Sequence, residues 1–129
     1  MRTLRHIHPP TSAHVDITVA MNTSFHEVFQ FDEEDVVTWD FVDKSFLLEI
    51  KGNYEQDTPL LIVGNDVGEI VVDDTATRIL HFNVAPSVLQ AALVPGRYVY
   101  DLLMTDGENV VTQLMHGDFI FALGVTGVD

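Results

Sequence analysis

Histidine can act as an acid, as a base and as a metal ligand. His6 and His8 are the two histidines closest together in this sequence. Two residues apart on an extended backbone, both rings lie on one side, where they could ligate one metal ion. No third ligand stands near them in the sequence, so an exposed pair without metal is the preferred interpretation. The chain has no cysteine, which excludes disulfides, thiolate metal sites and thiol nucleophiles. We therefore predict no metal site and no cofactor.

Tyr100 and Asp101 are the nearest approach to a proton-transfer pair. Adjacent residues of a strand point to opposite faces of the sheet, so these two side chains are not expected to act together. The sequence contains no G-x-S-x-G, no H-E-x-x-H and no P-loop. The acidic run at 32–35 offers oxygens to a calcium ion but lacks the spacing of a calcium-binding loop, so a solvated loop is predicted. We predict no catalytic residues and no enzymatic activity.

Four other side chains have both a functional and a structural interpretation. Trp39, the only tryptophan, could stack on a sugar ring as in carbohydrate-binding modules, but packing in the core is preferred. His26, His81 and His116 fall within or beside strand patterns. We interpret them as strand histidines and not as metal ligands.

Composition indicates one globular domain with a core of its own. The chain has 129 residues, of which 47% are hydrophobic, although its formal net charge is −14. Binding to nucleic acid or to an anionic membrane requires clustered Lys and Arg, and the chain has 6 of these against 20 acidic residues. No apolar run approaches the roughly 20 residues that cross a bilayer, and the N-terminus lacks the apolar core of a signal peptide. We expect no nucleic acid, no membrane and no small-molecule substrate among its partners.

Residues 1–14 differ from the rest of the chain in charge. They contain Arg2 and Arg5 and no acidic residue, whereas the remainder carries 20 acidic residues against four basic ones, a net charge of −16. The Pro9-Pro10 pair favours an extended backbone in this segment. We therefore predict an extended N-terminal arm at 1–14, followed by a β-sandwich domain at 15–129. The alternative is a frayed terminus.

The arm is expected to reach a neighbouring subunit. Copies of an acidic body repel one another when they assemble, and a basic arm laid across a neighbour offsets part of that repulsion. In this hypothesis Arg2 and Arg5 meet carboxylates of the neighbour, while Leu4 and Ile7 enter apolar pockets.

Short runs of alternating apolar and polar residues indicate strands in most of the remaining chain. Segment 86–93 alone has a helical pattern, a short one with a proline in its first turn. Strands and helices do not alternate, which argues against a parallel α/β sheet. We predict an all-β fold, a single antiparallel β-sandwich of immunoglobulin-like type with about eight or nine strands, and a closed barrel as the alternative. The expected core includes Phe29, Trp39, Leu48, Ile50, Leu61, Ile70, Leu80, Phe82, Leu89, Tyr98, Leu102, Leu114 and Phe119.

The segment 94–126 has the clearest pattern and is predicted to form an antiparallel meander. Its strands are expected at 98–102, 110–116 and 118–125, and Gly117 is expected to separate the last two. Since the alternation implies one buried face, the rest of the chain must supply a second layer.

Pro95, Gly96 and Tyr98 form the predicted structural turn that leads into this meander. A tyrosine just after a turn into a late strand resembles the tyrosine corner of immunoglobulin-like sandwiches, where the hydroxyl bonds a backbone group near the turn. We expect Tyr98 to make this bond. We expect Gly96 to adopt a positive φ, as in the third position of a type II turn.

The segment from Leu93 to Leu102 has the form L-x-P-G-x-Y-x-Y-D-L. It belongs to an ordered series that also includes the strand with Trp39, Asp43–Lys51, Pro59–Leu61, Gly68–Ile70, Asp106-Gly107, Leu114 with Gly117, and Val125-Thr126. In this order the elements resemble a family of small β-sandwich structural proteins of tailed-phage virions. The family includes modules similar to the N-terminal attachment domains of baseplate upper proteins. Lys44 stands where the family often has glycine, and the family offers no enzymatic residues.

The resemblance implies a non-enzymatic structural component of a tailed-phage virion, which mediates assembly or attachment in the tail, neck or baseplate through protein–protein contacts. The implied partners are other virion proteins and further copies of the chain in a symmetric assembly. The implied location is the virion, after synthesis in the host cytoplasm. Two alternatives stay open, a capsid-surface cement protein and a carbohydrate-binding module. A binding module should be monomeric with exposed aromatic side chains, whereas a virion subunit should self-associate or bury surface in a large assembly.

Overall fold

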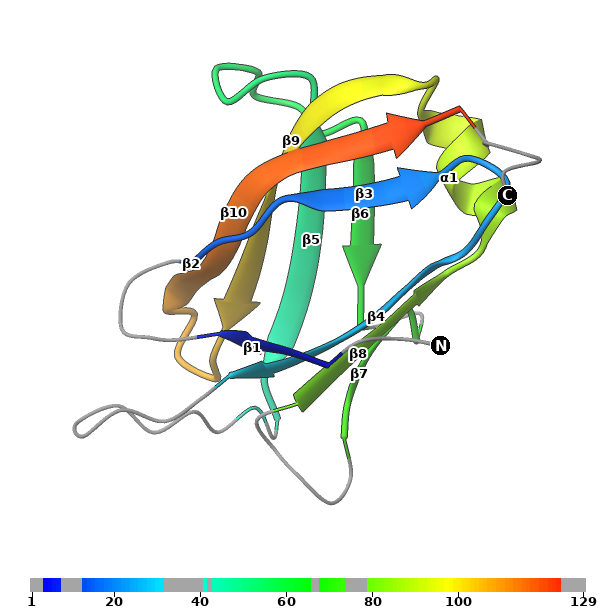
Figure 1. The fold of residues 1–129 in the computed structure, drawn as a ribbon. Helices are drawn as coiled ribbons and strands as arrows, with labels where there is room; N and C mark the ends of the chain where they lie inside the picture. Colours follow the sequence, from blue (N-terminus) through cyan, green and yellow to red (C-terminus); the bar gives the residue numbers. More distant parts are fainter. Residues whose placement is uncertain are drawn as a thin grey trace.

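The computed structural model describes residues 4–7, 13–31, 41, 43–65, 68–73 and 79–123, with only the backbone described for 4–7. The described residues form two packed β-sheets with one short helix at an end of the sandwich (Figure 1). The elements are β1 (Leu4–Ile7), β2 (Ala13–His14), β3 (Ile17–Ala20), β4 (Phe25–Phe31), β5 (Ser45–Lys51), β6 (Leu61–Gly64), β7 (Ile70–Val72), β8 (Ile79–Val84), α1 (Pro86–Ala92), β9 (Gly96–Thr105) and β10 (Val111–Ala122). The predicted all-β sandwich is confirmed.

The direction of pairing divides the strands into two groups. One sheet has four strands in the order β1-β4-β8-β7, and the other has six, in the order β2-β10-β9-β5-β6 with β3 also paired to β10. The pairings among β4 to β10 are antiparallel, as predicted. The pairings of β1, β2 and β3 are parallel, which the sequence does not predict. Apolar alternation identifies a strand but not the direction of its neighbour, because both ladders have the same side-chain period.

The N-terminal segment contributes strands to both sheets. β1 extends the four-stranded sheet at the edge of β4, and β2 lies beside β10 in the six-stranded sheet. The sequence predicts an extended N-terminal arm at 1–14, ahead of a sandwich domain that begins at residue 15. A sheet edge presents unpaired N–H and C=O groups to any extended segment, so backbone pairing recruits segments without apolar alternation. Residues 1–3 and 8–12 lie outside the described residues.

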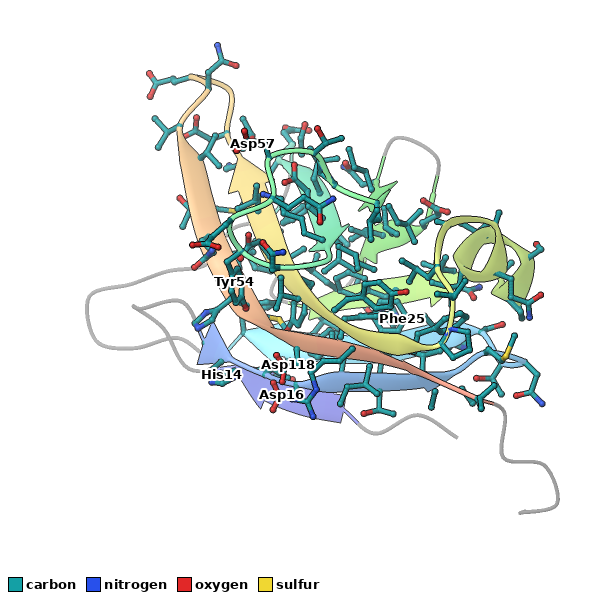
Figure 2. All side chains as sticks on the ribbon, turned by 90° about the horizontal axis from the view of Figure 1, so that it is seen from above. His14, Asp16, Phe25, Tyr54, Asp57 and Asp118 are labelled. Carbon is teal, nitrogen blue, oxygen red and sulfur yellow. The ribbon has the colours of Figure 1, made fainter. Side chains whose placement is uncertain are left out.

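Aromatic side chains fill the space between the sheets. The ring of Phe25 lies 5.6 Å from the ring of Phe82 and 5.6 Å from that of Phe119, so one side chain joins β4, β8 and β10 (Figure 2). Leu61 and Tyr98 of the predicted core are only partly buried. The predicted positions that are buried are Phe29, Leu48, Ile50, Ile70, Leu80, Phe82, Leu89, Leu102, Leu114 and Phe119. Further buried rings, absent from the predicted core, belong to Phe31, Phe41, Phe46, Tyr100 and Phe121.

A long hairpin of β9 and β10 takes the place of the predicted meander. β10 runs without interruption and pairs with β9 along its length, with one bulge between Gln113 and Met115. Gly117, which the sequence predicts to separate two strands, lies instead inside β10, opposite Tyr100 of β9. That prediction is wrong. The missing side chain of Gly117 allows another backbone to approach closely, as described below, and the chain does not reverse there.

The predicted helical turn at 86–93 is confirmed as α1, which connects β8 of one sheet to β9 of the other. Pro86 stands at its start, where the missing N–H costs no hydrogen bond. Leu89 is buried, and its carbonyl accepts a hydrogen bond from the Leu93 N–H at 2.8 Å. In the part of the chain that the structure describes, no helix is long and apolar enough to span a membrane.

Candidate functional site

The least regular part of the six-stranded sheet is the place where the N-terminal strands meet β10. β2 and β3 both run parallel to β10, and Val15 and Asp16 between them leave the ladder. The Val15 N–H donates to the carbonyl of His116 at 2.9 Å, and the Asp118 N–H donates to Asp16 Oδ1 at 2.9 Å. We name this region the N-terminal joint, and it consists of Val15, Asp16, Tyr54, Tyr100, Gly117 and Asp118.

Tyr100 anchors the joint from inside the core. Its hydroxyl donates to the carbonyl oxygen of Val15 at 2.6 Å, and the residue is 1% exposed. The same carbonyl lies against Gly117, since a Cβ added at Gly117 would be 2.4 Å from the Val15 oxygen. Only glycine allows the two backbones to approach this closely, which explains a glycine inside a regular strand.

Tyr54 closes the joint from the solvent side. It belongs to the loop after β5, its hydroxyl donates to the carbonyl of Gly117 at 3.1 Å, and the residue is 52% exposed (Figure 2). Partial burial, and after it the negative charges of Asp101 and Asp118, raise the pKa of this hydroxyl above its usual value of 10.0. The hydroxyl is therefore protonated, and remains a hydrogen-bond donor, at neutral pH.

Charged and aromatic side chains surround the joint on the outer face of the sheet. Arg97 Nη1 lies 2.8 Å from Asp118 Oδ2, and His14 Nε2 lies 3.1 Å from Asp16 Oδ1. The rings of His14 and His116 stack with centroids 5.2 Å apart. The hydrogen bond from the Asp118 N–H lowers the pKa of Asp16 below its usual 3.8, so this carboxylate is ionised at neutral pH.

The chemistry of the joint is attachment of one backbone to another. Tyr54 and Tyr100 each donate to a backbone carbonyl, and Asp16 accepts from a backbone N–H. Over the described ranges, no group of three or more His, Asp or Glu side chains could hold a metal ion. The arrangement binds the chain from β2 to β3 onto β10.

The predicted turn residues lie at the start of β9. The hydroxyl of Tyr98 donates to the carbonyl of Val94 at 2.6 Å and accepts a hydrogen bond from the Val94 N–H at 3.2 Å. This contact, made just before Pro95, is the one expected of a tyrosine corner. Gly96 does not have the expected positive φ. It is already paired with Phe121 of β10, so its backbone is extended and the type II turn is not formed there.

The arm residues are placed only in part. The backbones of Leu4, Arg5 and Ile7 lie in β1 and pair with β4 of the same chain. Arg2 lies outside the described residues. Contact of these four side chains with a neighbouring subunit stays a prediction.

Among the other described candidate residues, His26 and His81 are diagonal neighbours on the outer face of β4 and β8, since His26 pairs with Asn83. His26 is exposed on β4, and His81 Nε2 lies 2.8 Å from Asp73 Oδ2. Tyr100 is buried while Asp101 is partly exposed, in line with the predicted opposite faces. The positions that fall outside the described residues are His8, the acidic run at 32–35 and Trp39.

The joint is the part of the molecule that the sequence does not predict. Val15 and Tyr100 are 85 residues apart, and no local pattern connects them. Gly117 is the one available signal, because a lone glycine within a strand pattern indicates either a break or a close approach of another backbone. The sequence alone does not decide between these two meanings.

Comparison with known proteins yields a similarity of fold. No protein-family model matches the sequence, and no curated protein matches it. The solved structure of the "N-terminal domain of phage TP901-1 ORF48" is similar with a TM-score of 0.51 at 13% sequence identity, over 94% of this chain and 98% of that one. CopC from Methylosinus trichosporium OB3b is similar with a TM-score of 0.44 at 11% identity, over 92% and 90% of the two chains. The first match spans nearly the whole of both chains and shows a shared fold.

Proposed function

We propose that this protein is a non-enzymatic structural component of a tailed-phage virion. It mediates assembly or attachment in the tail, neck or baseplate through contacts with other virion proteins and with copies of itself. The observation that carries the proposal is a strip of exposed apolar side chains on the outer face of the six-stranded sheet. Similarity in fold to the N-terminal domain of a phage protein supports the same class of function.

The apolar strip consists of Leu47 on β5 and of Leu60 and Ile62 at β6. These residues are 38%, 44% and 50% exposed, and the alternation of both strands places Leu47 and Ile62 on the face opposite the core. Leu47 is paired with Gly64, two residues beyond Ile62, so Leu47 and Ile62 are diagonal neighbours. Glu49 lies directly opposite Ile62 on this face, beside Leu47. Exposed apolar side chains at the edge of a sheet favour a surface that another protein covers.

Two matched substitutions test the role of the strip. Ile62→Ser removes part of it, whereas Val71→Ser changes a residue of the same 50% exposure on β7, in the other sheet. In a phage that lacks its own copy of the gene, Ile62→Ser protein is expected to lower the yield of infectious particles about tenfold or more, as a lost apolar contact of about 1.4 kcal/mol would. Val71→Ser protein should restore the yield. Normal particles without any copy of the chain would refute the proposal.

The position of the chain in the particle separates the structural alternatives. Gold-labelled antibody against the chain is expected at the tail, neck or baseplate of purified particles. Label spread over the head would favour a capsid-surface cement protein instead.

A carbohydrate-binding module is the second candidate, and Tyr54 is the observation that favours it. Its exposed ring lies close enough to Asp101 and Asp118 for their charges to raise its pKa, and an aromatic ring beside polar groups is typical of sugar sites. Tyr54→Ala should then abolish the retardation of the protein in gels that contain cell-wall polysaccharide, while Tyr54→Phe preserves it. Wild-type protein that migrates freely in such gels would eliminate this candidate.

A further inference from the structure

We propose that β1 is an exchangeable strand. In an assembly, Leu4–Ile7 of one copy pairs with β4 of a second copy, in the register in which it pairs with its own β4 in the isolated chain. The partner of this sheet edge is thus another copy of the same protein. The inference rests on the proposed function in one respect: an assembly brings copies close together, and this closeness favours exchange.

β4 keeps its place without β1. It pairs with β8 from Phe25 to Gln30, and the side chains of Phe25, Phe29 and Phe31 are buried in the core. The edge that β1 covers is therefore formed by the rest of the domain. Its N–H and C=O groups accept an extended segment of suitable register from the same chain or from another.

The N-terminal joint fixes the other end of the exchangeable segment. Tyr100 bonds the carbonyl of Val15, the Asp118 N–H bonds Asp16, and β3 adds two buried side chains immediately afterwards. The chain therefore stays with its own body from β2 onward. Exchange is confined to the residues that precede the joint.

The sequence between β1 and β2 favours an open connection. Residues 8–12 are His-Pro-Pro-Thr-Ser. Consecutive prolines favour an extended polyproline conformation, which lengthens the reach of the strand before them. A strand on such a connection can move to a second copy without any new type of contact, which is the condition for domain swapping.

Concentration decides between the two arrangements. β1 makes the same backbone pairing in both, so neither gains from the pairing itself. A short linker gives a segment an effective concentration of about 1 mM at its own site, and copies held at a similar local concentration compete on equal terms. The exchanged segment includes Arg2 and Arg5 and no acidic residue, and it meets a body with a net charge of −16 in either arrangement.

Disulfides between engineered cysteines report strand exchange directly, because the chain has no cysteine of its own. The register places His6 opposite Gln30, and paired strand residues fall within the Cα separation of about 4.4–6.8 Å that a disulfide spans. His6→Cys protein and mass-tagged Gln30→Cys protein are mixed in urea, refolded together at about 10 μM and about 1 mM, and oxidised. Thr58→Cys replaces His6→Cys in the control mixture, since Thr58 is exposed in the loop after β5 and reports random collisions.

Exchange predicts a disulfide-linked heterodimer whose fraction rises about tenfold or more between the two concentrations and exceeds that of the control. The double variant His6→Cys/Gln30→Cys should close a disulfide within one chain at the lower concentration. The proposal is overturned if the double variant closes but the mixture never exceeds the control, and equally if the double variant never closes. Both measurements use purified protein, so their outcome is separate from the particle experiments that test the proposed function.

Discussion

Tyr98 and Tyr100 stand two residues apart on the same face of β9, yet their hydroxyls hold different parts of the molecule. Tyr98 bonds the backbone of Val94, four residues away, and Tyr100 bonds the backbone of Val15, 85 residues away. Tyr98 is only partly buried and fastens a local turn. Tyr100 is 1% exposed and joins the last hairpin to the N-terminal strands. Water can replace a lost partner at the turn but not in the core, so the joint should be the costlier of the two to disturb.

The largest effect is expected at Gly117, where the joint leaves no room for a side chain. Gly117→Ala would place a Cβ 2.4 Å from the Val15 oxygen and 2.9 Å from its carbonyl carbon, so the N-terminal strands must move away from β10. Forced overpacking of this kind should lower the free energy of unfolding by about 3 kcal/mol, as measured in urea. Gly107→Ala is the matched control, because nothing lies within 4 Å of its added Cβ. Equal urea midpoints for the two variants would disprove the close approach.

The next effect is expected from Tyr100→Phe, which keeps the buried ring and removes the hydroxyl. The carbonyl of Val15 then loses its donor, at a cost of about 1.5–2 kcal/mol in the free energy of unfolding. Amide hydrogen exchange should also quicken first in β3, where the joint holds the chain. If Tyr100→Phe lost less stability than Tyr98→Phe, the turn and not the joint would be the costlier region to disturb.

Tyr98→Phe tests the contact between Tyr98 and Val94 at the turn before β9. Its hydroxyl serves the exposed backbone of Val94 as donor and as acceptor, and water replaces both bonds after the substitution. We expect a loss of about 0.5–1 kcal/mol, with amide exchange changed only near the turn. An unchanged urea midpoint would show that the corner does not contribute to stability.

The same contrast explains which features could be predicted from the sequence. Leu80, Phe82 and Val84 alternate with polar neighbours, so their burial follows from the period of a strand. The Tyr98 contact was predictable because its partner is four residues away and belongs to a turn with its own sequence pattern. Such features depend on neighbours along the chain, and a single sequence contains that information.

The joint depends on neighbours in space. The contact between Tyr100 and Val15 requires the parallel placement of the N-terminal strands on β10, and strand alternation does not record direction. Gly117 was open to two interpretations, and the choice required knowledge of the backbone that lies against it. The type II turn at Gly96 failed for a related reason, since pairing with Phe121 overrides the local preference.

Two aspartates extend the comparison from hydroxyls to charges. The Asp118 N–H lowers the pKa of Asp16 in the joint, and the N–H groups of Val110 and then Glu108 lower the pKa of Asp106 in the turn between β9 and β10. Both carboxylates therefore bind a proton less readily in the folded chain than in the unfolded one, where their pKa is near 3.8. One holds distant segments together, and the other holds a turn.

The smallest effect is expected from the charge of Asp16, tested with Asp16→Asn, which keeps an acceptor oxygen and removes the ionisation. Because the folded-state pKa is lowered, the stabilisation is complete above the unfolded-state pKa of 3.8 and is lost as the pH falls from there through the folded-state value. The urea midpoint of Asp16→Asn should therefore lie below that of the wild type at neutral pH and converge with it under acid conditions. Asp106→Asn is the control and should show the same pH dependence, but with faster amide exchange confined to its own turn instead of β3. A difference between Asp16→Asn and wild type that stays constant through this acid range would show that the joint needs the oxygen of Asp16 and not its charge.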